Sequence, residues 1–256
     1  MGELGESYYI LGVKVDALQP SIALKKVLSW FEEPLKFHYI SSTNVNNVMN
    51  AIENKEFFDA TNEADLSLPD GVPFLWYGRW LGYRLHERCG IQELMFEIFE
   101  LSNRKYDFSH FFYGNTGTVL AETVSSLKKQ YPDLRIAGIY SPPFRELSLA
   151  ETDEIINNIN SIHPDFLWVS LGCPKQELWM YQNRHKLNVR VAGGAGAVFN
   201  FIAGYTRRAP AWIQYAGLEW LFRLILNPIR LWRRYLIKYP KFCVLLLLSF
   251  FRCNER

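Results

Sequence analysis

Short apolar runs alternate with longer amphipathic stretches from residue 8 to about residue 203. Short runs rich in β-branched and aromatic residues indicate strands, and stretches with apolar positions three or four apart indicate helices. The strands predicted in this way cover residues 8–15, 37–41, 66–68, 111–113, 135–139, 166–170 and 189–192. The helices predicted between them cover residues 21–31, 45–53, 56–63, 73–81, 92–102, 116–130, 151–161 and 175–185.

This alternation predicts an α/β fold with a mostly parallel sheet and helices on both of its faces. Residues 166–170 read FLWVS and are almost wholly apolar, as expected for a strand that is covered on both sides. The alternation stops near Ala209-Pro210, where a helical, aromatic and basic segment begins. We therefore expect a core of residues 1–208 and a helical C-terminal appendage of residues 209–256.

Charge is concentrated in this appendage. From Arg207 onward the chain has ten basic and two acidic residues, so this end carries +8 and the remainder −6. A helical wheel over residues 212–234 places Arg223, Arg230 and Arg234 on one face, with Arg233 at its edge, although Pro228 interrupts the helix. Such a face beside Trp and Leu fits an anionic membrane surface, or a diphosphate, or both. Nucleic acid is disfavoured as a partner because the body has no matching basic groove or motif.

Nothing in the sequence predicts a membrane span, a secretory signal peptide or a disulfide framework. The longest apolar run, residues 242–251, is about half of the ~18 residues that a span needs. It either dips into a membrane or packs as a buried terminal helix. The four cysteines show no metal-site or disulfide spacing, which fits a reducing compartment.

Two glycine-rich turns follow predicted strands. One contains Gly114, Asn115 and Gly117, and the other contains Gly194 and Gly196. Backbone N–H groups in turns of this kind often contact a diphosphate. Glycines also serve tight turns and close packing, so that alternative stays open. Neither turn continues as a P-loop.

Asp70 is the candidate catalytic base. It follows a predicted strand in the sequence Leu68-Pro69-Asp70-Gly71, where a simple turn is the alternative reading. Attack by a substrate hydroxyl is assisted by a carboxylate that accepts the proton of that hydroxyl. Glu177 is the competing candidate.

Two polar segments at other strand ends are candidate substrate-binding sites. Gly172 leads into a helix whose first turn carries Gln176 and Glu177, where an amide can bind sugar hydroxyls or a nucleobase and where helix capping is the alternative. Asn44 and Asn46 suit sugar recognition and equally suit an N-cap. The chain has no Asp-x-Asp pair, so we expect no metal and no cofactor, with arginine neutralising the leaving diphosphate.

Four stretches, residues 42–76, 111–119, 164–180 and 203–236, resemble the WecG/TagA/CpsF glycosyltransferases of bacterial surface polymers. They include FFYGNTGTV, PDFLWVSLGCPKQELWM and GLEWLFRLILNPIRLWRRYL, and the similarity extends over about residues 8–240. The resemblance implies a Rossmann-like core with a membrane-binding appendage on the cytoplasmic face of the bacterial plasma membrane. It also implies inverting, metal-independent transfer of a hexose or N-acetylhexosamine from a UDP-sugar to a polyprenyl-diphosphate-linked sugar, in cell-wall polymer or polysaccharide synthesis.

The resemblance also assigns roles to single residues. The base of the family falls on Asp70, its motif glutamine on Gln176, and its diphosphate-facing arginines on Arg223, Arg230 and Arg233. The chain departs from the family pattern at Asn44-Val45-Asn46, Glu93 and Asn200, which leaves the sugar undetermined. A nucleotide-sugar oxidoreductase and a non-catalytic membrane scaffold are the alternatives, and a homo-oligomer stays open.

Overall fold

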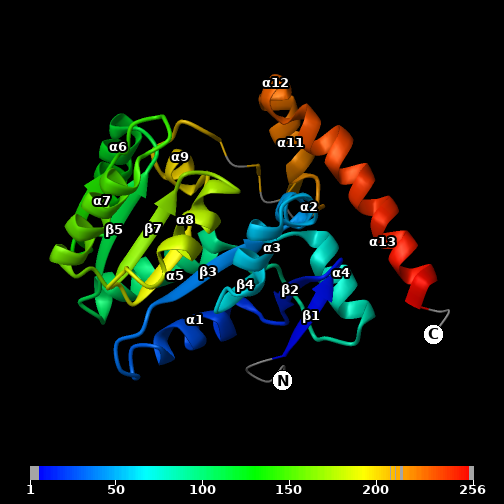
Figure 1. Ribbon diagram of the computed structural model, residues 1–256, viewed down its shortest axis with the longest axis horizontal. Helices are drawn as coiled ribbons and strands as arrows, with labels where there is room; N and C mark the ends of the chain where they lie inside the picture. Colours follow the sequence, from blue (N-terminus) through cyan, green and yellow to red (C-terminus); the bar gives the residue numbers. More distant parts are fainter. Residues whose placement is uncertain (1–5, 208, 211, 214–215, 254–256) are drawn as a thin grey trace.

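A six-stranded parallel sheet forms the centre of the computed structural model, which describes residues 6–207, 209–210, 212–213 and 216–253 (Figure 1). The strand order is β4-β3-β8-β7-β5-β6, and every neighbouring pair is parallel. The predicted α/β class is therefore confirmed. The strands are β3 (His38–Thr43), β4 (Leu66–Pro69), β5 (Ser109–Gly114), β6 (Arg135–Tyr140), β7 (Phe166–Ser170) and β8 (Val191–Gly194).

Helices cover both faces of this sheet because successive strand side chains point to opposite sides. Trp168 packs into the core on one face, whereas its neighbours Leu167 and Val169 pack into the core on the other. The first face is covered by α1 (Pro20–Ser29), α5 (Ile91–Arg104), α6 (Gly117–Gln130) and α9 (Val198–Ile202). The second is covered by α7 (Leu149–Ile162) and α8 (Lys175–Asn183), with α3 (Lys55–Asn62) packed beside α8.

The single strand predicted over residues 8–15 is wrong. The structure has a hairpin there, with β1 (Ser7–Ile10) and β2 (Val13–Asp16) antiparallel in a separate two-stranded sheet. The turn at Leu11 and Gly12 has φ of 50° and 83°, as in the tight turns that join antiparallel strands. The hairpin packs with α2 (Val45–Glu53) and α4 (Val72–Trp80) in a second core beside the main sheet.

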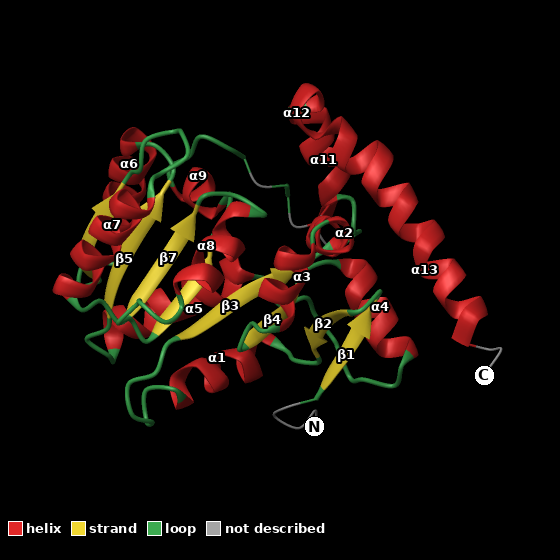
Figure 2. Cartoon of the chain, in the orientation of Figure 1, coloured by secondary structure: helices red, strands yellow, loops and turns green. Residues whose placement is uncertain are grey.

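The C-terminal segment is helical but broken. It comprises α11 (Glu219–Leu226), α12 (Pro228–Trp232), the π-helical turn η1 (Arg233–Lys238) and α13 (Tyr239–Cys253), and it lies along one side of the molecule (Figure 2). The interruption expected at Pro228 is confirmed, because α11 ends before Pro228 and a new helix begins there, so the arginine face of residues 212–234 is divided between helices. Arg223 is half-buried, whereas Arg230 and Arg233 are exposed.

Contacts with α2 and α4 hold this segment against the body. Lys238 and Lys241 pair with Glu53 at 3.3 and 3.2 Å. Phe242 is 2% exposed and its ring stacks on that of Phe74 with the centroids 6.1 Å apart. Over residues 242–249, one side of the helix thus packs on the core, while Val244, Leu247 and Leu248 are exposed. None of the described helices is both long and apolar enough to cross a bilayer.

The predicted boundary between core and appendage at residue 208 lies outside the described residues and stays a prediction.

Candidate active site

Asp70 lies at the carboxyl edge of the sheet, directly after β4. Its backbone N–H donates to the Thr43 carbonyl oxygen at 3.0 Å, which extends the pairing of β3 and β4 by one residue. The Asp70 side chain is half-buried. Ligands of open parallel sheets gather at this edge, so the carboxyl group is placed where a substrate would meet it.

Three effects raise the pKa of the Asp70 carboxyl. Burial is the largest, and the Glu93 and Glu219 carboxylates add to it, whereas the Arg88 and Arg223 guanidiniums oppose the rise. Gly90 allows the two acids to approach, because a Cβ at that position would lie 2.6 Å from Glu93 Oε2 and 3.2 Å from Asp70 Oδ1. A carboxylate with a raised pKa is a stronger base than an ordinary aspartate, which suits proton abstraction.

A chain of charged pairs connects the C-terminal segment to the surroundings of Asp70. Arg88 Nη1 lies 2.7 Å from Glu219 Oε2, and its Nη2 lies 3.2 Å from Glu93 Oε1. Glu219 also pairs with Arg223. Although burial opposes it, Arg223 and Arg88 hold the pKa of Glu219 below its usual range. The Arg223 guanidinium also acts to lower the pKa of Asp70, and the predicted role of Arg223 in binding the diphosphate stays a prediction.

Arg230 and Arg233 lie differently. Both are exposed, and the Arg233 guanidinium lies 5.4 Å from the centroid of the Trp232 ring. Their contact with a substrate diphosphate stays a prediction.

Gln176 and Glu177 at the start of α8 are bound within the protein. Gln176 Oε1 accepts from the Gly196 N–H at 3.0 Å, and its Nε2 donates to Glu177 Oε1 at 2.9 Å. Glu177 is 1% exposed, burial raises the pKa of its carboxyl, and its Oε2 has no hydrogen-bond partner among the described residues. This enclosure favours Asp70 over Glu177 as the base. Gln176 serves to connect two loops of the site, and its predicted contact with a substrate stays untested.

The glycine turns are explained mainly by packing. A Cβ at Gly114 would lie 2.5 Å from the Ser170 carbonyl oxygen, and one at Gly194 would lie 2.7 Å from Gln176 Nε2. The N–H groups of Asn115 and Gly196 already donate to Ser170 O and Gln176 Oε1, both at 3.0 Å. These two donors therefore already have partners within the protein, as in the packing alternative, and contact of the turns with a diphosphate stays a prediction. A Cβ at Gly117 or Gly172 would have no described atom within 4 Å, so these two positions leave room for a ligand.

Asn44 is the N-cap of α2. Its Oδ1 accepts from the N–H groups of Asn46 and Asn47 at 3.0 and 3.3 Å, which is the capping alternative. The Asn46 side chain turns toward the loop after β7, and its Nδ2 donates to Cys173 Sγ at 3.4 Å. Sugar binding by either residue stays a prediction.

Sequence reasoning did not identify Arg88 and Glu219 as residues of this site. Arg88 precedes α5 in a loop without a recognisable motif. Glu219 carried a signal that could have been used, since it is one of only two acids in the basic segment after Arg207. An acid retained in such a segment is expected to pair with a nearby cation.

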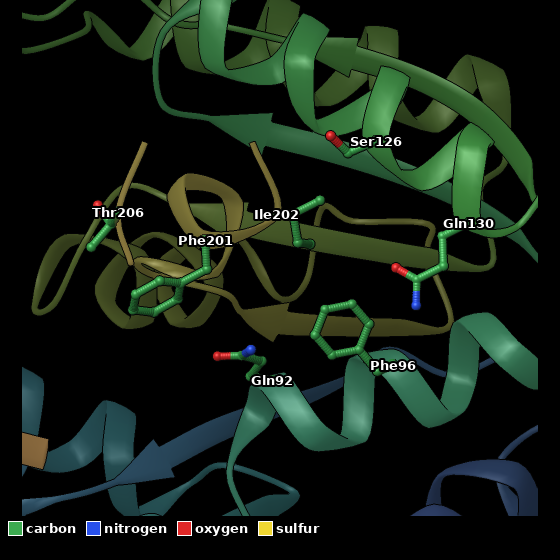
Figure 3. Close-up of a pocket in the computed structure, with 7 residues that line it drawn as sticks. All are labelled: Gln92, Phe96, Ser126, Gln130, Phe201, Ile202 and Thr206. Atoms are coloured by element: carbon green, nitrogen blue, oxygen red, sulfur yellow. The ribbon is translucent and has the colours of Figure 1, made fainter. Parts of the chain in front are cut away.

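A pocket of about 250 Å³ lies between α5, α6 and α9 (Figure 3). It does not include Asp70, and its uncharged lining cannot supply an acid or a base. Among the described residues there is also no group of three or more His, Cys, Asp or Glu side chains that could hold a metal ion. The residues that line the pocket are Gln92, Phe96, Ser126, Gln130, Phe201, Ile202 and Thr206.

Comparisons with known proteins identify a family and several relatives. The model of the glycosyl transferase WecG/TagA/CpsF family matches residues 8–256. An N-acetylglucosaminyldiphosphoundecaprenol N-acetyl-beta-D-mannosaminyltransferase of Bacillus subtilis is 31% identical over 228 residues, 86% of each chain. Its counterpart in Bacillus spizizenii is 31% identical over 80% of this chain and 76% of its own length. That of Staphylococcus aureus (strain NCTC 8325) is 24% identical over 88% of this chain and 85% of its own length.

The match covers the sheet edge that carries Asp70 and the C-terminal helices that carry Arg223. This chain therefore belongs to the WecG/TagA/CpsF family of glycosyltransferases.

Proposed function

We propose that the protein transfers N-acetylmannosamine from UDP to a polyprenyl-diphosphate-linked N-acetylglucosamine, with inversion and without a metal ion. The names of the relatives support this choice of sugars. The observation that carries the proposal is the position of Asp70, a half-buried carboxyl with a raised pKa, beside guanidinium groups from both the body and the C-terminal segment.

In the proposed reaction, Asp70 accepts the proton of the acceptor hydroxyl as its oxygen attacks the anomeric carbon. The bond from that carbon to the UDP oxygen breaks on the opposite face, and the negative charge moves onto the diphosphate. Arg223, together with Arg230 and Arg233 once substrate is bound, stabilises this charge. Guanidinium groups bind phosphate oxygens through two parallel hydrogen bonds, so they can serve where other transferases use a cation.

We further propose that the C-terminal segment binds the cytoplasmic face of the membrane. Ile225 and Ile229 on α11 and α12 are 70% and 92% exposed. Trp76 and Trp80 on α4 are both 66% exposed. α13 packs against α4 through Phe242 and Phe74, and α4 lies on the same side of the molecule as the C-terminal helices (Figure 1). Apolar and aromatic side chains among basic residues are typical of helices that lie in the membrane interface.

The test is transfer from a panel of UDP-sugars to a short-chain polyprenyl-diphosphate N-acetylglucosamine. The proposal expects turnover with UDP-N-acetylmannosamine and much slower turnover with UDP-glucose, UDP-galactose or UDP-N-acetylglucosamine. Preferred use of another UDP-sugar would contradict the choice of donor, and absence of transfer from every donor would contradict the proposal as a whole.

A further inference from the structure

Arg234 of the C-terminal segment interacts electrostatically with Cys173, in the loop after β7. It is half-buried in η1, unlike the exposed Arg233 before it. Its Nε is buried and has no hydrogen-bond partner among the described residues. Burying a cationic donor without a partner is costly, so such a group is often held for a ligand. π-Helical turns of this kind also occur frequently at functional sites.

The surroundings of Arg234 supply further donors. Its guanidinium interacts with the Cys173 thiol and lies within hydrogen-bonding reach of the Tyr239 hydroxyl. Asn46 Nδ2 and Asn50 Nδ2 both donate to Cys173 Sγ, at 3.4 and 3.2 Å. A thiol sulfur is a weak acceptor, so an anion that entered here could take over both amide donors at little cost.

This group of donors is coupled to Asp70 and belongs to a helix that carries exposed apolar side chains. Tyr239 interacts electrostatically with Asp70, and burial raises the pKa of the Tyr239 hydroxyl to about 12 although Arg234 opposes the rise. In the same helical turn as Arg234, Leu236 and Ile237 are 58% and 49% exposed, and the exposed Leu247 and Leu248 follow in α13. The lipid-linked acceptor consists of a reacting sugar, an anionic diphosphate and a lipid chain, in that order. These three parts match a base, a group of donors and an apolar helix surface.

We propose that Arg234, assisted by Asn46 and Asn50, binds the diphosphate of the lipid-linked acceptor. This inference rests on the proposed function and assigns the acceptor's anion to a residue separate from Arg223, Arg230 and Arg233. The acceptor sugar then points toward Asp70, and the polyprenyl chain leaves across η1 and α13. A water-soluble donor has no reason to lie against that apolar surface, which is why the acceptor is the expected ligand.

The test compares two short-chain acceptors that differ only in carrying a diphosphate or a monophosphate. The wild-type enzyme should have a KM for the diphosphate acceptor at least about tenfold below that for the monophosphate acceptor, as expected for a charge-assisted hydrogen bond. Arg234→Gln should reduce this ratio to about two- or threefold and leave the KM for the UDP-sugar within about twofold. Arg234→Lys should give an intermediate ratio of the two KM values, because lysine keeps the positive charge but lacks the planar guanidinium that forms two parallel hydrogen bonds.

Arg135→Gln is the matched control, because Arg135 pairs with Asp107 at the opposite edge of the sheet, at 3.1 Å. An unchanged ratio in Arg234→Gln, or a rise in the KM for the donor instead, would overturn the assignment. If Arg234→Gln does not fold, the test depends on Arg234→Lys. A ratio of the two KM values in Arg234→Lys equal to that of the wild-type enzyme would then overturn the assignment. Absence of transfer by the wild-type enzyme to either acceptor would contradict the proposed function, and the assignment would fall with it.

Discussion

Glu219 Oε2, in the first helix of α11–α13, lies 2.7 Å from Nη1 of Arg88, in the loop that flanks Asp70. Glu219 also pairs with Arg223. This carboxylate therefore pairs with one arginine of the body and one of the C-terminal segment, and both guanidiniums act to lower the pKa of the candidate base. Both ion pairs are largely shielded from water, with 14% of the Glu219 side chain exposed, so salt screens them less than a surface pair.

Replacement of Glu219 should loosen the C-terminal segment. In Glu219→Gln the two arginines lose their shared counter-charge, so α11 is held less firmly and trypsin should cleave the segment several-fold faster. A double-mutant cycle with Arg88→Ala should give a coupling energy of about 0.5–3 kcal/mol for unfolding. Glu100→Gln, which removes an exposed ion pair with Arg104 on α5, is the control. It should leave the rate of trypsin cleavage of the C-terminal segment unchanged. Cleavage at the wild-type rate would show that the pair does not hold the segment.

The pH dependence of activity should report the environment of Asp70. The base must be ionised, so kcat/KM falls as pH decreases through its pKa, and burial and Glu93 place that pKa above the usual aspartate range. Glu93→Gln removes a negative neighbour, which lowers the pKa of Asp70 and moves the acidic limb to lower pH. Glu100→Gln again serves as the control. A limb that stays in place, or moves to higher pH, would argue against Asp70 as the titrating group.

Two glycine substitutions separate packing from phosphate binding. Gly114→Ala places a Cβ 2.5 Å from the Ser170 carbonyl oxygen at a φ of 106°, so it should lower the free energy of unfolding by about 1–3 kcal/mol. Gly117→Ala has open space and begins a helix, so it should leave stability unchanged and instead raise the KM for the UDP-sugar. Thermal unfolding and donor kinetics measure both effects. A stable Gly114→Ala protein with weakened donor binding would reverse this interpretation.

Membrane binding should depend on the exposed apolar side chains of the C-terminal segment. Ile229→Asp and Leu247→Asp should each weaken sedimentation with anionic vesicles by about tenfold, which corresponds to losing most of one buried aliphatic side chain. Leu149→Asp is the matched control, since Leu149 is 83% exposed on α7, away from this segment. Equal sedimentation of all four proteins, wild type included, would contradict binding through these helices.

The sequence predicted the parallel sheet well because buried strands such as residues 166–170 are apolar throughout and their helices carry clear periodicity. It did not predict the hairpin at residues 7–16, since an apolar run looks continuous across Leu11-Gly12 even though those two residues form a turn. The hairpin also forms its own two-stranded sheet and packs in a separate core, so the pattern of the parallel sheet gives no information about it.

The site was predictable only in part. Asp70 could be identified because it follows a strand directly, and strand ends meet at one edge of a parallel sheet. Arg88, Glu219 and the inward position of Arg234 depend on how the C-terminal helices dock. That docking follows from long-range pairs such as Lys238 with Glu53, which no local pattern contains.

Transfer in the presence of EDTA tests the central claim most directly, namely that an aspartate and arginines carry out the reaction without a cation. With excess chelator, the wild-type enzyme should keep its full rate from UDP-N-acetylmannosamine. Under the same conditions Asp70→Asn should lose about 10²–10⁴ and Arg223→Ala about 10²–10³ in kcat, whereas the exposed control Asp107→Asn should be unaffected. Loss of wild-type transfer on chelation, with recovery when a divalent cation is restored, would contradict the account.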